Sequence, residues 1–111
     1  MRVEALIAKG DFKVVNQGED IQREISQPYC CDLLSIAMGR MPAGAAWVTV
    51  MGNINTLAVA TLADASCIIL GEGSQLDEPA LNKAREQKIT VLATELPIFD
   101  AALLVYQQLN A

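Results

Sequence analysis

The sequence predicts an α/β fold with three layers, in which a mixed, mainly parallel β-sheet lies between two layers of helices. Three apolar runs, at residues 46–51, 66–70 and 89–93, each pass through a short polar loop into a segment with helical spacing. Because a strand, a helix and a further strand in succession bring two parallel strands together, these runs predict the parallel part of the sheet. The preceding residues show a shorter helix–strand–strand–helix pattern, which predicts that the sheet is mixed.

The first part of the chain supplies two helices and two strands. Apolar residues at helical spacing predict a helix over residues 2–9, which ends at Gly10. Residues 12–15 alternate like a strand, and residues 21–25 predict a second, more exposed strand. Residues 32–38 carry apolar side chains at positions i, i+1, i+4 and i+5, the pattern of an amphipathic helix.

The central strand, at residues 46–51, is apolar on both sides and therefore suits an interior position in the sheet. We expect Trp47 in this strand to lie in the core or in an interface. The following helix, residues 57–63, has almost no polar side, so we expect it to be buried against the sheet or in a dimer interface. Its candidate N-caps are Asn53, Asn55 and Thr56.

Two further strand–helix units complete the chain. After the strand at residues 66–70, an acidic turn with an early proline begins a helix over residues 80–87. The last strand, at residues 89–93, leads into a terminal helix over residues 98–109. The expected N-caps of the terminal helix are Thr94 and Glu95, and its expected inward side chains are Leu103, Leu104 and Tyr106.

Composition limits the classes of function. A chain of 111 residues is expected to form one domain. Thirteen acidic residues outnumber eight basic ones, and no run of Lys or Arg occurs, so we expect binding neither to nucleic acid nor to a membrane surface. The beginning of the chain is too short and too charged for a signal peptide, which predicts a cytoplasmic protein. The 52% share of hydrophobic residues favours a homodimer or a complex with a partner protein.

Chemically reactive side chains are few. The chain has no histidine, and therefore lacks the usual general base and the commonest transition-metal ligand. Its cysteines, Cys30, Cys31 and Cys67, are interpreted as small apolar residues of a reducing compartment, and a redox role of the adjacent pair stays open. Acidic residues such as Asp32 and Glu95 are expected on the solvated surface. We expect no catalytic residue, no metal and no cofactor.

Four segments carry a resemblance to a known family: residues 28–34, the strand region 44–50, residues 65–73 and the closing run 88–94. With the opening helix, they make nearly the whole chain resemble the DRTGG domain family, which is similar to the N-terminal domain of HPr kinase/phosphorylase. The five residues that name the family do not occur here. Asn53-Ile54 stands where the family has an acidic–basic pair, and Gly71-Glu72-Gly73 stands where it has Thr-Gly-Gly.

The resemblance implies one DRTGG-like domain over residues 1–111, with a fold like the N-terminal domain of HPr kinase. It also implies an accessory role, because members of the family are attached elsewhere to phosphotransacetylase-like enzymes and to CBS-containing pyrophosphatases. In HPr kinase the domain lies outside the catalytic P-loop domain, and this sequence has no Gly-x-x-x-x-Gly-Lys-Ser/Thr motif. Kinase chemistry is therefore not expected.

Loops at the carboxyl ends of the parallel strands are the expected ligand site, because open α/β sheets hold ligands there. Backbone N–H groups at these helix starts are expected to form an anion cradle, although Gly and Asn are equally explained by the backbone freedom that a tight turn needs. The candidate ligand-binding residues are Gly52, Asn53, Asn55, Thr56, Gly71, Glu72, Gly73, Ser74 and Thr94.

Two functions remain open on this reading. The first is a non-catalytic regulatory or interaction module, which acts as a homodimer or on a partner protein through an apolar surface of small residues. The second is a sensor that binds a nucleotide or another phosphorylated metabolite at the carboxyl-end loops. An enzymatic function is not expected, since histidine, a P-loop and a metal-ligand cluster are absent from the sequence.

Overall fold

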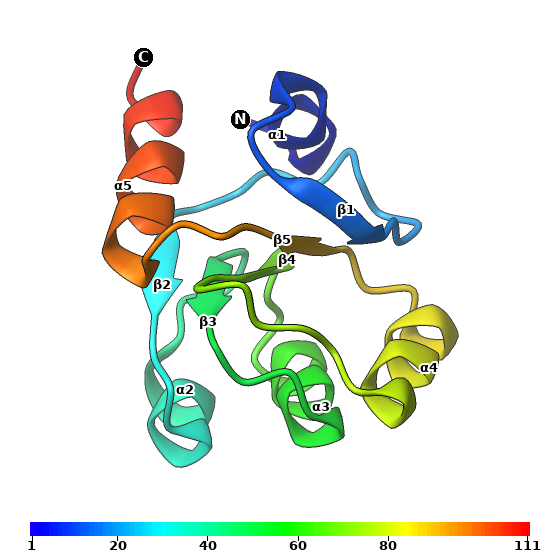
Figure 1. Ribbon diagram of the computed structural model, residues 1–111. Helices are drawn as coiled ribbons and strands as arrows, with labels where there is room; N and C mark the ends of the chain where they lie inside the picture. Colours follow the sequence, from blue (N-terminus) through cyan, green and yellow to red (C-terminus); the bar gives the residue numbers. More distant parts are fainter.

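A computed structural model describes residues 1–111 and has the three-layer α/β/α architecture that the sequence predicts. The sheet has five strands: Lys13–Asn16 (β1), Pro28–Cys30 (β2), Ala46–Thr49 (β3), Cys67–Leu70 (β4) and Val91–Ala93 (β5). The helices are Val3–Lys9 (α1), Leu34–Arg40 (α2), Ile54–Leu62 (α3), Glu78–Gln87 (α4) and Ile98–Leu109 (α5). Helices α2, α3 and α4 cover one face of the sheet, and α1 and α5 cover the other (Figure 1).

The strand order is β1-β5-β4-β3-β2, with β1 antiparallel to β5 and all other neighbours parallel. The mixed, mainly parallel sheet is therefore confirmed. Its side chains alternate between two cores: Trp47 and Ile68 face the side of α2, α3 and α4, whereas Val48 and Ile69 face the side of α1 and α5. All four side chains are fully buried, as expected for strands that are covered on both faces.

Edge strand β2 is absent from the sequence prediction. It is only three residues long and begins with Pro28, which lacks the N–H that a central strand would need. Its pairing with β3 joins Tyr29 to Trp47 in parallel register, so the parallel part of the sheet begins one strand earlier than the apolar runs indicate. The Trp47 indole N–H donates to the carbonyl of Cys31 just beyond β2, at 2.9 Å, which supports the core interpretation of this tryptophan.

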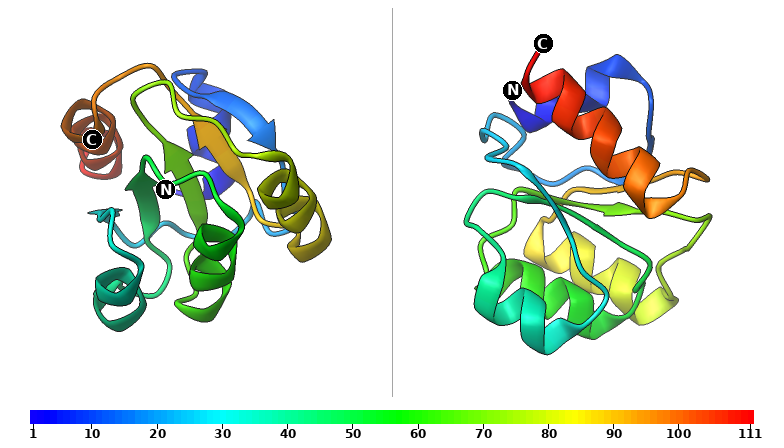
Figure 2. Two further views of the ribbon diagram at one scale, coloured as in Figure 1. Left: turned by 60° about the horizontal axis from the view of Figure 1, so that its bottom comes forward. Right: turned by 90° about the vertical axis from the view of Figure 1, so that its left-hand side faces the viewer.

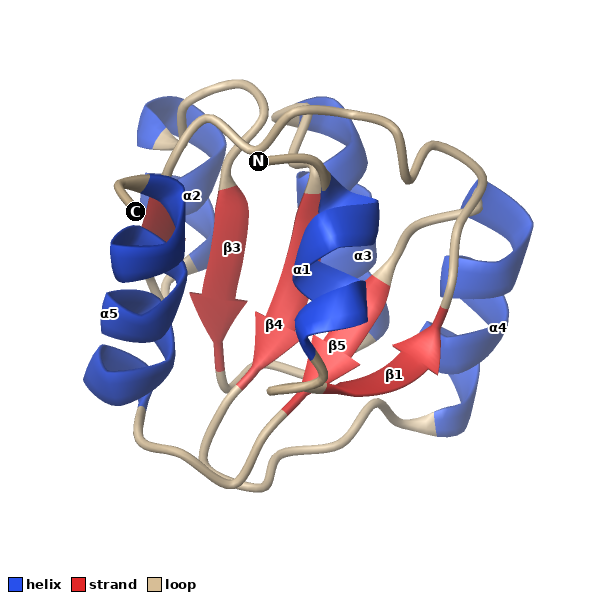
Figure 3. Ribbon diagram, turned by 90° about the horizontal axis from the view of Figure 1, so that it is seen from above, coloured by secondary structure: helices blue, strands red, loops and turns tan.

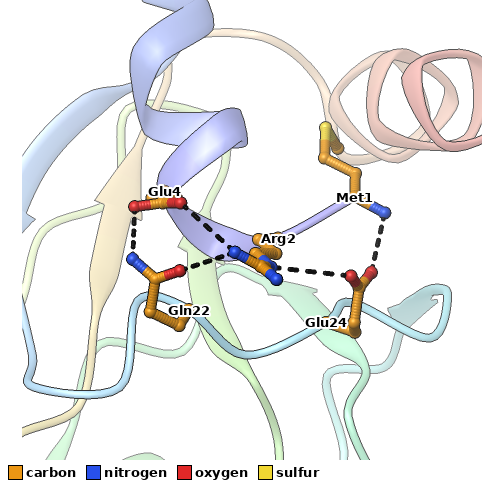
Figure 4. Close-up of polar contacts among 5 residues, drawn as sticks. All are labelled: Met1, Arg2, Glu4, Gln22 and Glu24. Atoms are coloured by element: carbon orange, nitrogen blue, oxygen red, sulfur yellow. Dashed lines mark hydrogen bonds and ion pairs between the residues drawn. The ribbon is translucent and has the colours of Figure 1, made fainter.

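The strand predicted at residues 21–25 is wrong, because this segment carries the chain from edge strand β1 to the opposite edge at β2 (Figure 1). It pairs with the start of α1 instead of the sheet: the amide of Val3 donates to Arg23 and that of Glu4 to Ile21. A surface cluster of Met1, Arg2, Glu4, Gln22 and Glu24 reinforces the contact, with 3.0 Å between the Met1 amino group and Glu24 (Figure 4).

Helix α3 begins three residues earlier than predicted because Asn53 is its N-cap. The Asn53 side-chain oxygen accepts from the amides of Asn55 and Thr56 at 3.0 and 3.2 Å, so the latter two residues lie inside the first turn and do not cap it. The helix is buried on one side only, since Leu62 is 71% exposed. Asp77 caps α4 in the same way by accepting from the Ala80 amide.

Helix α5 has the predicted bounds but turns a different face to the core. Ala101 and Val105 are fully buried against the sheet, and the predicted inward residue Leu104 is partly buried against the same core. The other two predicted inward residues, Leu103 and Tyr106, are 38% and 56% exposed. Small Ala101 allows the helix to lie close to β2 and β3. The N-cap is Pro97 rather than Thr94 or Glu95. No helix is both long and apolar enough to span a membrane.

Candidate functional site

The loops that follow β3, β4 and β5 meet at one edge of the sheet, where the chain leaves each strand (Figure 3). All nine predicted ligand-binding residues lie in these loops or in the first turn of α3. The structure divides them between two places. One group follows β3, and the other follows β4 and β5.

The loop after β4 does not form the expected anion cradle. The amide of Gly71 donates to Thr49, that of Glu72 to Leu96, that of Gly73 to Thr94 and that of Ser74 to Gly71, over 2.9–3.1 Å. Because all four N–H groups are bound within the protein, they are not free to bind a phosphate. The expectation of a backbone cradle at this loop is wrong.

The group after β3 is occupied by structural contacts. The amides of Asn55 and Thr56 are bound by the Asn53 cap, and Thr56 is fully buried. A Cβ placed on Gly52 would lie 2.1 Å from the carbonyl oxygen of Gln75, and the Gly52 carbonyl accepts from Asp77 at 2.9 Å. Glycine is therefore required at position 52 because two backbones approach each other closely there.

Three predicted residues, Gly73, Ser74 and Thr94, meet in an open cleft of about 680 Å³. This cleft, named here the β1–α4 cleft, lies between β1, the beginning of α4 and the loops after β4 and β5. Its lining residues are Asp11, Lys13, Val14, Val15, Gly73, Ser74, Gln75, Leu76, Leu81, Ala93, Thr94 and Glu95. Its volume falls in the range of about 300–1,000 Å³ that is usual for small-molecule sites.

The polar side chains of the cleft include several that make no hydrogen bond or ion pair within the protein: those of Lys13, Ser74, Gln75 and Glu95. Thr94 uses its hydroxyl to accept from the amide of Leu96. A Cβ at Gly73, whose φ is +72°, would lie 2.5 Å from a carboxylate oxygen of Glu95, so this glycine leaves room for that carboxylate. The unpaired groups are free to bind a ligand.

Lys13 and Asp11 are two charged lining residues that the sequence did not indicate. They reach the carboxyl edge because β1 runs antiparallel to β5, which pairs Lys13 with Ala93 at the end of β5. The pattern at residues 12–15 predicted a strand but not its neighbour, so nothing placed these charges near the loops. The Asp11 carboxylate also accepts from the side-chain amide of Gln108 at 2.7 Å.

The cleft also has apolar walls. Val15, Leu76 and Ala93 rest on the core beneath the sheet, and Leu81 of α4 also lines the cleft. A cleft with apolar walls, one ammonium group and two carboxylates suits a ligand that has a flat apolar part and few charges.

Outside the cleft, several titratable side chains make contacts within the protein or are buried. Asp32 is exposed, as expected, and its carboxylate also accepts from the buried Thr49 hydroxyl at 2.7 Å and from the Val50 amide at 3.0 Å. Desolvation and the nearby Asp32 raise the pKa of the Cys30 thiol, which disfavours the reactive thiolate. Burial raises the pKa of Cys67 to about 12. No three His, Cys, Asp or Glu side chains are grouped to hold a metal.

A smaller hollow of about 170 Å³ lies at the opposite, amino-end edge of the sheet. Arg23 crosses it to Asp64, donating to the carboxylate and to the carbonyl of that residue, each at 2.8 Å. The hydrogen bond from Arg23 lowers the pKa of the Asp64 carboxyl. Asp64 itself has a φ of +64°, and this two-point contact fastens the turn after α3 to the crossing segment.

Comparison with known proteins identifies a fold. No family model matches the chain, and no curated protein matches it. Among solved structures, 96% of the chain superposes with a TM-score of 0.76 and 15% identity on the CBS and DRTGG domains of the regulatory region of Clostridium perfringens pyrophosphatase, complexed with the activator diadenosine tetraphosphate. The chain spans 46% of that structure's length. Its fold is thus similar to that regulatory region.

Proposed function

We propose that this chain is a non-catalytic regulatory module that acts as a homodimer. The observation that carries the proposal is the outer face of α5, where Phe99, Leu103 and Tyr106 are 70%, 38% and 56% exposed. These positions follow the i, i+4, i+7 spacing of one helical stripe, named here the α5 stripe. The stripe lies opposite the buried Ala101 and Val105, so α5 is apolar on two sides.

A second copy of the chain fits this stripe best. Helix α5 lies at the surface over the β2 edge of the sheet, and no other element covers its outer side (Figure 2). Helix α5 contains a single charged residue, Asp100, so most of the charge behind the net value of −5 lies outside this helix. Two antiparallel α5 helices therefore bring apolar surfaces together with little charge repulsion.

The size of the stripe predicts a weak dimer. Aromatic side chains cover about 150–250 Å² each, so the exposed parts of Phe99, Leu103 and Tyr106 amount to about 300 Å² per copy. Two copies would bury about 600 Å² through these side chains, below the roughly 1,200–2,000 Å² of stable interfaces. We expect a dissociation constant of about 10–100 μM.

Sedimentation equilibrium of the full chain tests the dimer. Phe99→Glu places a charge in the stripe, and we expect it to give a monomer at concentrations where the unchanged chain dimerises. Leu62→Glu is the comparison variant: Leu62 is equally exposed but lies on α3, the other helix for which the sequence left a dimer interface open, and we expect this substitution to leave the dimer intact. A monomeric unchanged chain at about 100 μM, or equal weakening by both substitutions, would contradict the proposal.

A second candidate function, a sensor of nucleotides or phosphorylated metabolites, is favoured by the β1–α4 cleft and by the basic Lys13 within it. The similar pyrophosphatase region was solved with a nucleotide activator, which supports the same class of ligand. A thermal-shift screen tests this function, because a ligand at a hundred times its dissociation constant adds about 2.7 kcal/mol of stability. A flat screen across nucleotides and phosphorylated metabolites would leave only the interaction module.

A further inference from the structure

We propose that the β1–α4 cleft binds a nucleoside or a nucleoside 5′-monophosphate and discriminates against di- and triphosphates. This inference rests on the second candidate function, and it names the class of nucleotide. It follows from three properties of the cleft: its apolar walls, its unpaired hydrogen-bonding groups and its balance of charge.

The apolar walls suit a nucleobase. Leu76 and Ala93 form part of a floor that rests on the buried core, and Leu81 of α4 lines another side. A flat base that lies between aliphatic side chains is removed from water, which is favourable. An aromatic side chain is not required for this gain. An open cleft of about 680 Å³ has room for a base together with a ribose.

The unpaired polar groups match the edges of a nucleoside. The Gln75 amide both donates and accepts, which is what a base edge requires. The Glu95 carboxylate oxygens accept hydrogen bonds, and ribose hydroxyls are suitable donors for them. The Ser74 hydroxyl adds a further donor and acceptor beside them.

The charges of the cleft limit the number of phosphate groups that a bound ligand can carry. Lys13 is the only basic residue that lines the cleft, and two residues with carboxylates, Asp11 and Glu95, line it as well. The exposed Glu72 precedes Gly73 in the same loop, and the N–H groups of residues 71–74 are bound within the protein. A monophosphate can pair with the single ammonium group of the cleft. Each additional phosphate group would have only carboxylates nearby and would be repelled by them.

Calorimetric titration of the full chain tests the inference, with adenosine, guanosine, cytidine and uridine, their 5′-monophosphates and their triphosphates as probes. We expect at least one base series to bind, with the triphosphate about tenfold weaker than the monophosphate. In Lys13→Met the monophosphate loses its advantage over the nucleoside, while nucleoside affinity is unchanged. In Glu95→Gln the triphosphate gains relative to the monophosphate. Lys83→Met is the matched control, since Lys83 lies on α4 outside the cleft.

The outcomes separate this inference from the broader functions. A triphosphate that binds more tightly than its monophosphate overturns the inference but leaves nucleotide sensing in place. Equal effects of Lys13→Met and Lys83→Met place the site outside the cleft and overturn it as well. Absence of binding by all probes at about 1 mM overturns the inference and counts against a nucleotide sensor, whereas the dimer is decided separately by sedimentation.

Discussion

Replacing Gly52 by alanine tests whether glycine at the carboxyl edge serves packing rather than ligand binding. The new Cβ would lie 2.1 Å from the Gln75 oxygen, 2.8 Å from the Gln75 carbonyl carbon and 3.2 Å from the Leu76 Cα, all backbone atoms. Relieving such overpacking costs about 1–3 kcal/mol. Moving the loops apart also weakens the 2.9 Å hydrogen bond from Asp77 to Gly52, worth about 0.5–1.5 kcal/mol. We expect a total loss of about 2–4 kcal/mol.

Gly39→Ala provides the matched control. Gly39 lies in α2, and a Cβ there would meet no atom within 4 Å, so alanine should stabilise the chain by about 0.5–1 kcal/mol. Urea denaturation of both variants measures the difference, and at an m-value of about 1–3 kcal/mol per molar their midpoints should differ by roughly 1 M or more. A Gly52→Ala protein as stable as the unchanged chain would refute the packing argument.

Three further predictions concern titration and buried polar contacts. Because burial raises the pKa of Cys67 to about 12, while an unfolded thiol titrates near 8.5, stability should fall as pH rises from about 9 towards 12, by up to about 1.4 kcal/mol per unit. Urea denaturation between pH 8 and 10 should show this slope, and Cys67→Ala should reduce it. Arg23→Met should destabilise the chain at pH 7, and the loss should shrink below about pH 4, because Arg23 lowers the pKa of Asp64 and that stabilisation disappears as the carboxyl is protonated. Thermal unfolding at the two pH values measures the difference. Asp32→Ala should cost about 2 kcal/mol in urea denaturation, because the buried Thr49 hydroxyl loses its acceptor.

The parallel half of the fold could be predicted because its signals are local. Strands β3 and β4 are buried on both faces and therefore appear in the sequence as continuous apolar runs. The N-cap roles of Asn53 and Asp77 also depend only on residues within a few positions. The two strands were predicted with small errors at their ends, and Asn53 was one of three candidate N-caps, whereas the cap at Asp77 was not predicted beyond an acidic first turn.

Long-range pairing could not be predicted in the same way. Residues 21–25 have a strand-like composition, but the chain must cross between the two sheet edges there, and only the complete topology shows this. The short edge strand β2 is recognised as a strand only through its pairing with β3. Helix α5 has apolar residues on two sides, so periodicity alone did not indicate that Ala101 and Val105, rather than Tyr106, face the sheet.

The candidate site was predicted only in part for a related reason. Gly73, Ser74 and Thr94 line the cleft, as their position after parallel strands indicates. Lys13 joins them through an antiparallel pairing about eighty residues away in sequence. The use of the loop amides by Thr49, Leu96 and other carbonyls could not be read from composition, because it depends on how neighbouring loops pack.

The central claim is that two copies of the chain associate through α5. The most direct measurement is proton NMR of the aromatic rings on dilution, because the chain has only two phenylalanines and two tyrosines. Between about 1 mM and 10 μM, the signals of Phe99 and Tyr106 should move, while those of Phe12, 5% exposed in the core, should stay constant. Ring signals of Phe99 and Tyr106 that do not change with concentration would contradict the account.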